Sequence, residues 1–268
     1  MTDEIDLEAE YNNRARVPDH MEAMGQWKAT AEAARAAHPP ETIAYGPGPR
    51  EVMDLFSAGP EAPVAVFLHG GYWQALDKDW FSGLAPALLS HGVSLAVPSY
   101  DLAPNVRLSR ILEQVRAAVD LIRARTGKRP LVFGHSAGGH MSAGMLSEGR
   151  VSAALAISGV FDLRPLVGTS INTALDLNLN EAAALSPVFW PIPNGSTPGG
   201  TVLDCIVGGD ESPEFLRQSR MMADHWGANG VQTRYEALPG LNHFTVLGPL
   251  LDADSALVKR IVELAKGA

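Results

Sequence analysis

The sequence contains a single cysteine, Cys205, among its 268 residues. One thiol excludes a disulfide framework or a thiolate metal cluster within the chain, and its apolar neighbours predict a small buried side chain. Long apolar runs are also missing, because no stretch approaches the roughly 20 residues that a membrane-spanning helix needs. The first ten residues, MTDEIDLEAE, are acidic, whereas a secretory signal begins with basic and then apolar residues. We therefore expect a soluble, cytoplasmic protein without a membrane segment.

Basic residues are fewer than acidic ones and are scattered along the sequence. The chain has 21 Lys and Arg against 30 Asp and Glu, which gives a formal net charge of -9 at pH 7. Such a chain disfavours nucleic acid as a partner. His135 and His140 are five residues apart and do not share a helical face, so we expect no metal site. We also expect no organic cofactor. A small-molecule substrate is the expected partner, and a second copy of the chain remains a candidate partner because the sequence leaves the oligomeric state open.

Internal repeats and low-complexity linkers are absent, and 46% of the residues are hydrophobic, which favours one domain over residues 1–268. Short apolar runs typical of buried strands occur at 64–68, 93–97, 131–133, 153–157 and 202–207, and residues 232–238 alternate. Helix-like stretches lie at 79–90, 108–125, 137–147, 213–228 and 250–265. This alternation predicts an α/β fold with a mostly parallel sheet covered by helices on both faces.

Two further regions flank this pattern. An N-terminal helical segment, about 1–40, contains a helix-like stretch at 19–37 that we expect to pack over the sheet or to cover the site. The region from about 161 to 200 is rich in Pro and Gly, with one short helix around 173–184. It is typical of a lid or of an insertion that shapes a pocket, and the alternative is an ordinary long surface connection.

The pattern Gly134-His135-Ser136-Ala137-Gly138 carries the main chemical signal. A G-x-S-x-G pattern alone is weak in a chain with 26 glycines, but this one follows a predicted strand and precedes a predicted helix. That context is the nucleophile elbow of the α/β-hydrolase fold, in which a strained turn presents a serine at the carboxyl end of the sheet. Ser136 is therefore the candidate nucleophile, and the following helix N-terminus favours developing negative charge.

A serine hydroxyl needs a base and an acid that orients the base. His243 follows the last predicted strand on a loop expected at the same edge of the sheet as Ser136, and the chain order Ser, acid, His is usual for this fold. The acid is expected in the loop after strand 202–207, where Asp210 and Glu211 are both candidates. Glu214 lies in the first turn of the next helix, where it is expected to interact with the helix dipole.

The run FLHGGYW at 67–73 ends the first strong strand with two glycines. The backbone N–H groups of Gly71 and Tyr72, together with that of Ala137, are the expected oxyanion hole. We expect Trp73 to border the substrate pocket, with packing on a neighbouring helix as the alternative. His135 is also expected beside the pocket, with its side chain turned into packing.

These motifs resemble the kynurenine formamidase (arylformamidase) branch of the α/β hydrolases, which is related to hormone-sensitive-lipase-type esterases. The resemblance spans nearly the whole chain. Its carriers are EYNNR at 10–14, VPDH at 17–20, HGGYWQ at 69–74, YDLAP at 100–104, GHSAGGH at 134–140, SPEF at 212–215 and RQS at 217–219. Aligning on SPEF places Glu211 where better-known members carry the triad aspartate. The resemblance thus favours Glu211 over Asp210. The chain departs from the family here, because it has a glutamate where the better-known members have an aspartate.

The resemblance implies a serine hydrolase that cleaves a small amide or ester through an acyl-enzyme. An N-formylkynurenine-like formamide with an aromatic group is the substrate that it favours. Two alternatives remain: a short-chain carboxylesterase without a formamidase role, and a catalytically silent relative that binds a small ligand or a protein partner.

Overall fold

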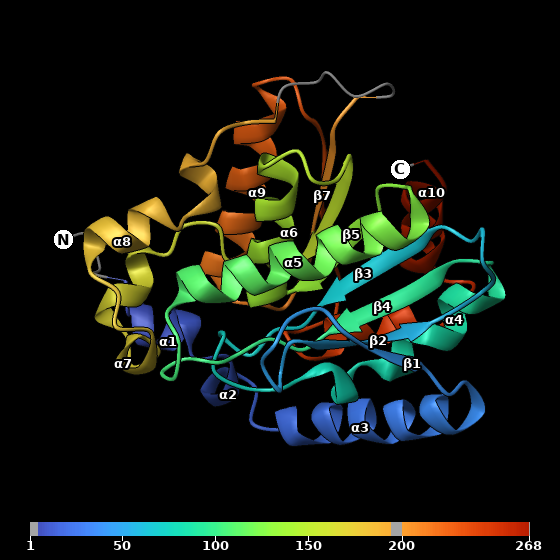
Figure 1. Ribbon diagram of the computed structural model, residues 1–268. Helices are drawn as coiled ribbons and strands as arrows, with labels where there is room; N and C mark the ends of the chain where they lie inside the picture. Colours follow the sequence, from blue (N-terminus) through green and yellow to red (C-terminus); the bar gives the residue numbers. More distant parts are fainter. Residues whose placement is uncertain (1–4, 194–199, 268) are drawn as a thin grey trace.

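The computed structural model describes residues 5–193 and 200–267, and its centre is one eight-stranded sheet (Figure 1). The strands are β1 (Glu41–Ala44), β2 (Val52–Phe56), β3 (Val64–Leu68), β4 (Ser94–Pro98), β5 (Leu131–His135), β6 (Ala153–Ile157), β7 (Val202–Gly208) and β8 (Gln232–Leu238). Their order in the sheet is β1-β2-β4-β3-β5-β6-β7-β8. β1 pairs with β2, and β2 with β4, in antiparallel fashion, and every other pairing is parallel. The predicted mostly parallel sheet is confirmed.

In the described part of the chain, eight α-helices lie outside the segment from 161 to 200 and surround or extend this sheet. They are α1 (Leu7–Tyr11), α2 (Asn13–Arg16), α3 (His20–Ala37), α4 (Ala85–Ser90), α5 (Leu108–Thr126), α6 (Ala137–Ser147), α9 (Pro213–Gly227) and α10 (Ala256–Gly267). Short helices α7 (Asn172–Leu175) and α8 (Leu179–Ala184) and five 3-10 turns complete the elements. The turns are η1 (Lys78–Trp80), η2 (Ser82–Leu84), η3 (Arg164–Gly168), η4 (Pro187–Phe189) and η5 (Thr245–Leu251).

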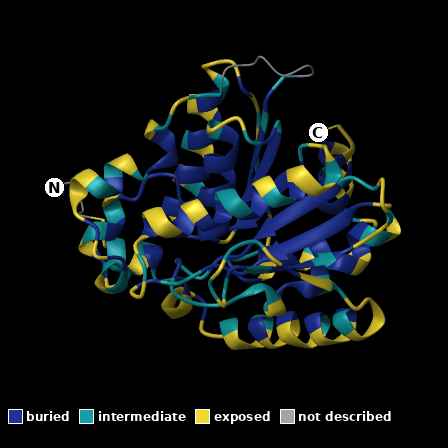
Figure 2. Cartoon of the chain, in the orientation of Figure 1, coloured by how far each residue is buried: buried dark blue, intermediate teal, exposed yellow. Residues whose placement is uncertain are grey.

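The helices form a layer on each face of the sheet. One apolar cluster joins one set of strand side chains to α5, α6 and α9, and a second joins the opposite set to α3, α4 and α10. In β3, all five side chains are buried, because alternate residues point into the two clusters. Figure 2 shows the resulting dark-blue sheet between helices whose outer faces are exposed. Among the described residues, no helix combines the length and apolar character required to cross a bilayer.

Several predicted boundaries change in the structure. β1 and β2 were not predicted from the sequence, because both are short edge-side strands next to Pro- and Gly-rich turns. The helix expected at 79–90 is two 3-10 turns followed by α4, since Pro86 starts a helix well but cannot lie inside one. The helix expected at 250–265 begins only at Ala256.

The two flanking regions both supply residues to the cavity that is described below. The N-terminal segment forms α1, α2 and α3, and the segment from 161 onward contains η3, α7, α8 and η4. The single helix expected at 173–184 is divided, because Asp176 adopts a left-handed conformation and Asn178 caps a new helix. Residues 1–4 of the first region and 194–199 of the second lie outside the described part of the chain.

Candidate active site

The turn between β5 and α6 is built by two glycines that allow close backbone approach. A Cβ atom at Gly138 would lie 1.8 Å from the carbonyl oxygen of Leu68, and one at Gly134 would lie 2.4 Å from the carbonyl oxygen of Gly138. Ser136, between them, has φ 57° and ψ -117°, a conformation that costs a non-glycine residue about 1–3 kcal/mol. Its N–H donates to the carbonyl oxygen of Ile157 in β6 at 2.8 Å. The tight packing explains the G-x-S-x-G spacing and fixes the position of Ser136.

His243 and Glu211 form a direct hydrogen bond. Nδ1 of His243 lies 2.6 Å from Oε2 of Glu211, and both residues are buried. The other carboxylate oxygen accepts the Gly208 N–H at 2.8 Å and the hydroxyl of Ser158. Since the carboxylate accepts a hydrogen bond from Nδ1–H, Nε2 is the ring nitrogen that can act as a base. The structure therefore brings together the predicted histidine and the acid that the resemblance favoured.

Asp210 does not take part in this contact. Its side chain is exposed, and its N–H donates to the carbonyl oxygen of Leu241 at 3.0 Å. The two neighbouring acids thus differ sharply in environment, and only Glu211 faces His243. The geometry favours Glu211 as the orienting carboxylate.

Ser136 and His243 line the same cavity. No hydrogen bond joins the Ser136 hydroxyl to the His243 imidazole within the described residues. Such contacts are often long without substrate and tighten in the complex. The backbone of His243 is itself held, because Nε2 of His135 donates to its carbonyl oxygen at 2.9 Å.

The glycine loop after β3 runs directly against the elbow. A Cβ atom at Gly70 would lie 3.1 Å from Cβ of Ser136. Gly71, Tyr72 and Trp73 have φ values of 100°, 48° and 58°, so three successive residues have a left-handed backbone. No described residue accepts a hydrogen bond from the N–H of Gly71 or Tyr72. These donors, with the Ala137 N–H at the start of α6, are available to an oxyanion.

Two buried aromatic rings hold the base of this loop. His69 stacks on Tyr100 with ring centroids 4.1 Å apart, and the Tyr100 hydroxyl donates to the His69 carbonyl oxygen at 2.8 Å. Burial lowers the pKa of His69 to about 3, so its ring is neutral. His69 is therefore a packing residue of the loop.

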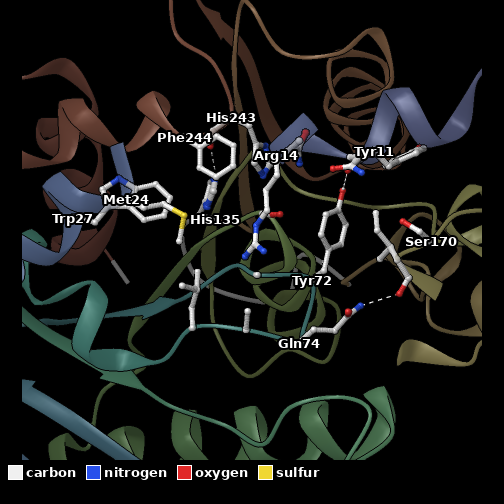
Figure 3. A pocket seen from close by; sticks show the side chains of 17 residues that line it. Tyr11, Arg14, Met24, Trp27, Tyr72, Gln74, His135, Ser170, His243 and Phe244 are labelled. Atoms are coloured by element: carbon white, nitrogen blue, oxygen red, sulfur yellow. Dashed lines mark hydrogen bonds between the residues drawn. The ribbon is translucent and has the colours of Figure 1, made fainter. Parts of the chain in front are cut away.

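The cavity has a volume of about 360 Å³, and both Ser136 and His243 line it. Figure 3 shows His243 close to His135 and Phe244 in its wall. Its lining comes from six segments of the chain and consists of Tyr11, Asn12, Asn13, Arg14, Met24, Trp27, Gly71, Tyr72, Gln74, Ala75, Leu76, His135, Ser136, Ser170, Ile171, His243 and Phe244. Much of the wall thus belongs to the N-terminal segment. Sequence reasoning missed these residues as site residues, although the EYNNR motif at 10–14 marked the segment.

Trp73 requires a correction. It was expected beside the pocket, but it does not line the cavity and is fully buried. Its ring packs edge-on against His140 of α6, with centroids 4.9 Å apart. The left-handed backbone at Trp73 turns the side chain under the loop, so the alternative of packing on a neighbouring helix describes it.

His135 lies at the cavity wall as expected, and its ring also packs against neighbouring rings. Its ring centroid is 4.6 Å from that of His243 and 6.2 Å from that of Trp27. Burial, together with the nearby His243 ring, holds the pKa of His135 well below its usual range. His135 is therefore neutral and serves as a hydrogen-bond donor to the His243 backbone.

Glu214 lies in the first turn of α9, as expected, and also binds a side chain of α1. Its carboxylate accepts the Tyr11 hydroxyl at 2.6 Å and two hydrogen bonds from Arg217, at 2.6 and 2.8 Å. This contact ties α1 to α9 and so fixes the N-terminal wall of the cavity. In the described part of the chain, no group of three or more His, Cys, Asp or Glu side chains could hold a metal ion.

Comparison with known proteins points to one family. Residues 65–265 match the family model described as "Alpha/beta hydrolase family". The chain is 30% identical to a kynurenine formamidase of Drosophila melanogaster over 243 residues, covering 83% of this chain and 81% of the relative. It is 28% identical to a kynurenine formamidase of Danio rerio over 235 residues, covering 83% and 80%.

A solved structure from Silicibacter sp. TM1040, provisionally described as a thioesterase, has 32% sequence identity and a TM-score of 0.85. The match covers 98% of this chain and all of that one.

Proposed function

This chain belongs to the alpha/beta hydrolase family and is a hydrolase related to kynurenine formamidases, and on that premise we propose that it is a serine hydrolase acting through an acyl-enzyme. The observation that carries the proposal is the 2.6 Å hydrogen bond from His243 to Glu211 at the wall of the cavity that also exposes Ser136. A nucleophile, a base and an orienting acid are the three groups that acyl transfer requires.

In the first half-reaction, Oγ of Ser136 attacks the substrate carbonyl carbon while Nε2 of His243 takes the hydroxyl proton. Glu211 keeps the imidazole in the right tautomer and stabilises its positive charge. The N–H groups of Gly71, Tyr72 and Ala137 donate to the oxyanion. His243 then gives its proton to the leaving amine or alcohol as the carbon–leaving-group bond breaks, and the acyl group stays on Ser136.

The second half-reaction uses the same groups in reverse roles. His243 removes a proton from water, the resulting hydroxide attacks the acyl carbon, and the oxyanion hole again stabilises the intermediate. His243 returns the proton to Oγ of Ser136 as the ester bond breaks, which releases the acid and restores the enzyme.

The substrate that we propose is an aryl formamide like N-formylkynurenine. The names of the Drosophila and Danio relatives support this class, as do the aromatic side chains of Trp27, Tyr72 and Phe244 in the cavity wall. The candidate second function is hydrolysis of short esters or thioesters, which the description of the Silicibacter relative favours.

One variant tests the chemistry. Ser136→Ala should abolish hydrolysis of both N-formylkynurenine and p-nitrophenyl acetate, and it should not react with a fluorophosphonate probe that labels the wild type. Turnover by the variant would remove Ser136 as the nucleophile. An unlabelled and inactive wild type would instead favour the silent, ligand-binding alternative.

A second experiment tests the substrate. Values of kcat/KM for N-formylkynurenine, p-nitrophenyl acetate and an acetyl thioester, measured on the same enzyme, rank the candidate functions. A formamide value well above both esters supports the formamidase, and the reverse order supports the esterase.

A further inference from the structure

The cavity beside Ser136 has one permanently charged side chain in its wall. Of its 17 lining residues, Arg14 is the only Arg or Lys, and none is Asp or Glu. Glu211 is buried behind His243 and takes no part in the lining. His135 is neutral because burial keeps its pKa far below the usual range. A ligand in this cavity therefore meets the Arg14 guanidinium and no Asp or Glu among the lining residues.

Arg14 has no side-chain partner among the residues that the structure describes. It forms no hydrogen bond or ion pair with any described residue, and its side chain is exposed. Some arginines are paired, as Arg217 is with Glu214 at 2.6 Å, whereas Arg14 combines the lack of a partner among the described residues with a place in the cavity wall. An unpaired guanidinium that faces a substrate cavity has all its N–H donors free for a ligand.

The backbone that carries Arg14 is firmly placed. The Tyr11 hydroxyl donates to Glu214, and the Tyr72 hydroxyl donates to the Tyr11 carbonyl oxygen at 2.8 Å. Asn12 caps α2 by accepting the Ala15 N–H at 3.1 Å. Figure 3 shows Arg14 extending into the space between His135 and Tyr72, with the apolar side chains of Trp27 and Met24 beyond His135 on the left. Little ordering of the main chain is needed when a ligand binds Arg14.

We propose that Arg14 is a specificity residue that selects substrates bearing a carboxylate on the group next to the scissile bond. The proposal rests on the proposed serine-hydrolase function and adds the anion that this site recognises. Guanidinium binds carboxylate through two parallel charged hydrogen bonds. Because the whole chain has a formal net charge of -9, its overall field disfavours a carboxylate, and a local cation is needed to bind one.

The test compares two formamides that differ in one carboxylate: zwitterionic N-formylkynurenine, and its amide, in which a carboxamide replaces the carboxylate and the α-amino group is kept. The wild type should prefer the carboxylate by about 10-fold or more in kcat/KM, the size expected of a hydrogen bond to a charged group. Arg14→Ala should reduce this preference to less than about 3-fold, mainly by raising KM for the carboxylate substrate. Arg14→Lys should retain part of it, because lysine keeps the charge but not the fork.

Arg16→Ala is the matched control. Arg16 lies two residues away on α2, is exposed and does not line the cavity. It should leave the preference unchanged. Raising the salt concentration should weaken the preference of the wild type but not that of Arg14→Ala, because salt screens exposed charges. An equal loss on both substrates in Arg14→Ala, or an equal effect of Arg16→Ala, would overturn the inference.

A wild type that cleaves no formamide would test the proposed function separately from the role of Arg14. If the wild type cleaves neither formamide, the same comparison is made with 4-acetoxybenzoate and phenyl acetate, which differ in one carboxylate. If no substrate is turned over, the proposed function fails, and calorimetric binding of kynurenine and kynurenine amide to wild type and Arg14→Ala decides the inference. Equal affinities of the wild type for both compounds would then refute it.

Discussion

The hydroxyl of Ser158 donates a hydrogen bond to Oε1 of Glu211. The other oxygen of this carboxylate lies 2.6 Å from Nδ1 of His243, so Ser158 and His243 hold Glu211 from two sides. Ser158 follows β6 with a φ of 52°, and its N–H donates to the carbonyl oxygen of Ile206 at 2.7 Å. The strained turn after β6 thus places a hydroxyl where it orients the acid.

Removing this hydroxyl should weaken catalysis without removing any group that reacts. We expect Ser158→Ala to lower kcat about 10-fold with little change in KM, because one of three hydrogen bonds to the Glu211 carboxylate is lost. Ser158→Gly loses the same hydroxyl but relieves the strain of the positive φ, so it should match Ser158→Ala in kcat and exceed it in stability. Steady-state kinetics and thermal unfolding of the two variants check these expectations. A normal kcat in both variants would show that Ser158 has no positioning role.

The two acids of the β7–α9 loop should respond very differently to substitution. Glu211→Ala removes the group that holds the His243 imidazole and should lower kcat by about 10³- to 10⁴-fold. Asp210→Ala removes an exposed side chain and should change kcat by less than about 3-fold. Measuring kcat and thermal unfolding for both variants separates catalysis from folding. A larger loss in Asp210→Ala would reverse the assignment of the acid.

Much of this arrangement could be predicted from local sequence signals. The buried strands β3, β5 and β6 are uniform apolar runs, which only a doubly covered sheet accommodates. β1 and β2 have mixed burial, and their antiparallel pairing depends on distant partners, so no local pattern marked them. The elbow could be predicted because the turn leaves no room for a Cβ atom two residues before and two residues after the serine, and the sequence has glycine at both positions.

Side-chain directions were harder to predict. Trp73 follows two glycines at a predicted pocket, yet its left-handed backbone sends the ring against α6, and sequence does not encode that angle locally. Asp210 and Glu211 are adjacent in sequence, and only the course of the loop decides which one is buried. Arg14 reaches the cavity because Tyr11 binds Glu214, a contact over 203 residues that no periodicity reports.

The contact between α6 and β3 should tolerate no side chain at Gly138. A Cβ atom there would lie 1.8 Å from the Leu68 carbonyl oxygen, so Gly138→Ala must push the helix away from the sheet. We expect a loss of at least about 3 kcal/mol in the free energy of unfolding, measured by urea denaturation. Gly25→Ala is the control, because Gly25 is exposed within α3 and a Cβ there meets no atom within 4 Å. It should stabilise the protein by about 0.5–1 kcal/mol.

Three buried histidines should make the protein less stable in mild acid. Burial lowers the pKa of His69 to about 3 and that of His140 to about 4, and it lowers that of His135 well below 6.5. Below pH 6.5 the unfolded chain binds protons at these residues while the folded chain does not. The free energy of unfolding therefore falls as the pH falls, by about 1.4 kcal/mol per pH unit for each histidine until its folded pKa is reached.

A single substitution isolates one of these contributions. Nε2 of His140 donates to the carbonyl oxygen of Leu185 at 2.7 Å, a hydrogen bond that a glutamine amide also offers. Between pH 6 and pH 5, His140→Gln should reduce the pH dependence of the unfolding free energy by about 1.4 kcal/mol per pH unit, whatever its effect on absolute stability. His38→Gln, which changes an exposed histidine, should leave the dependence unchanged. If His140→Gln and the wild type had the same pH dependence of the unfolding free energy, His140 would become protonated within the folded protein. That result would contradict the burial of its ring between Trp73 and Trp190.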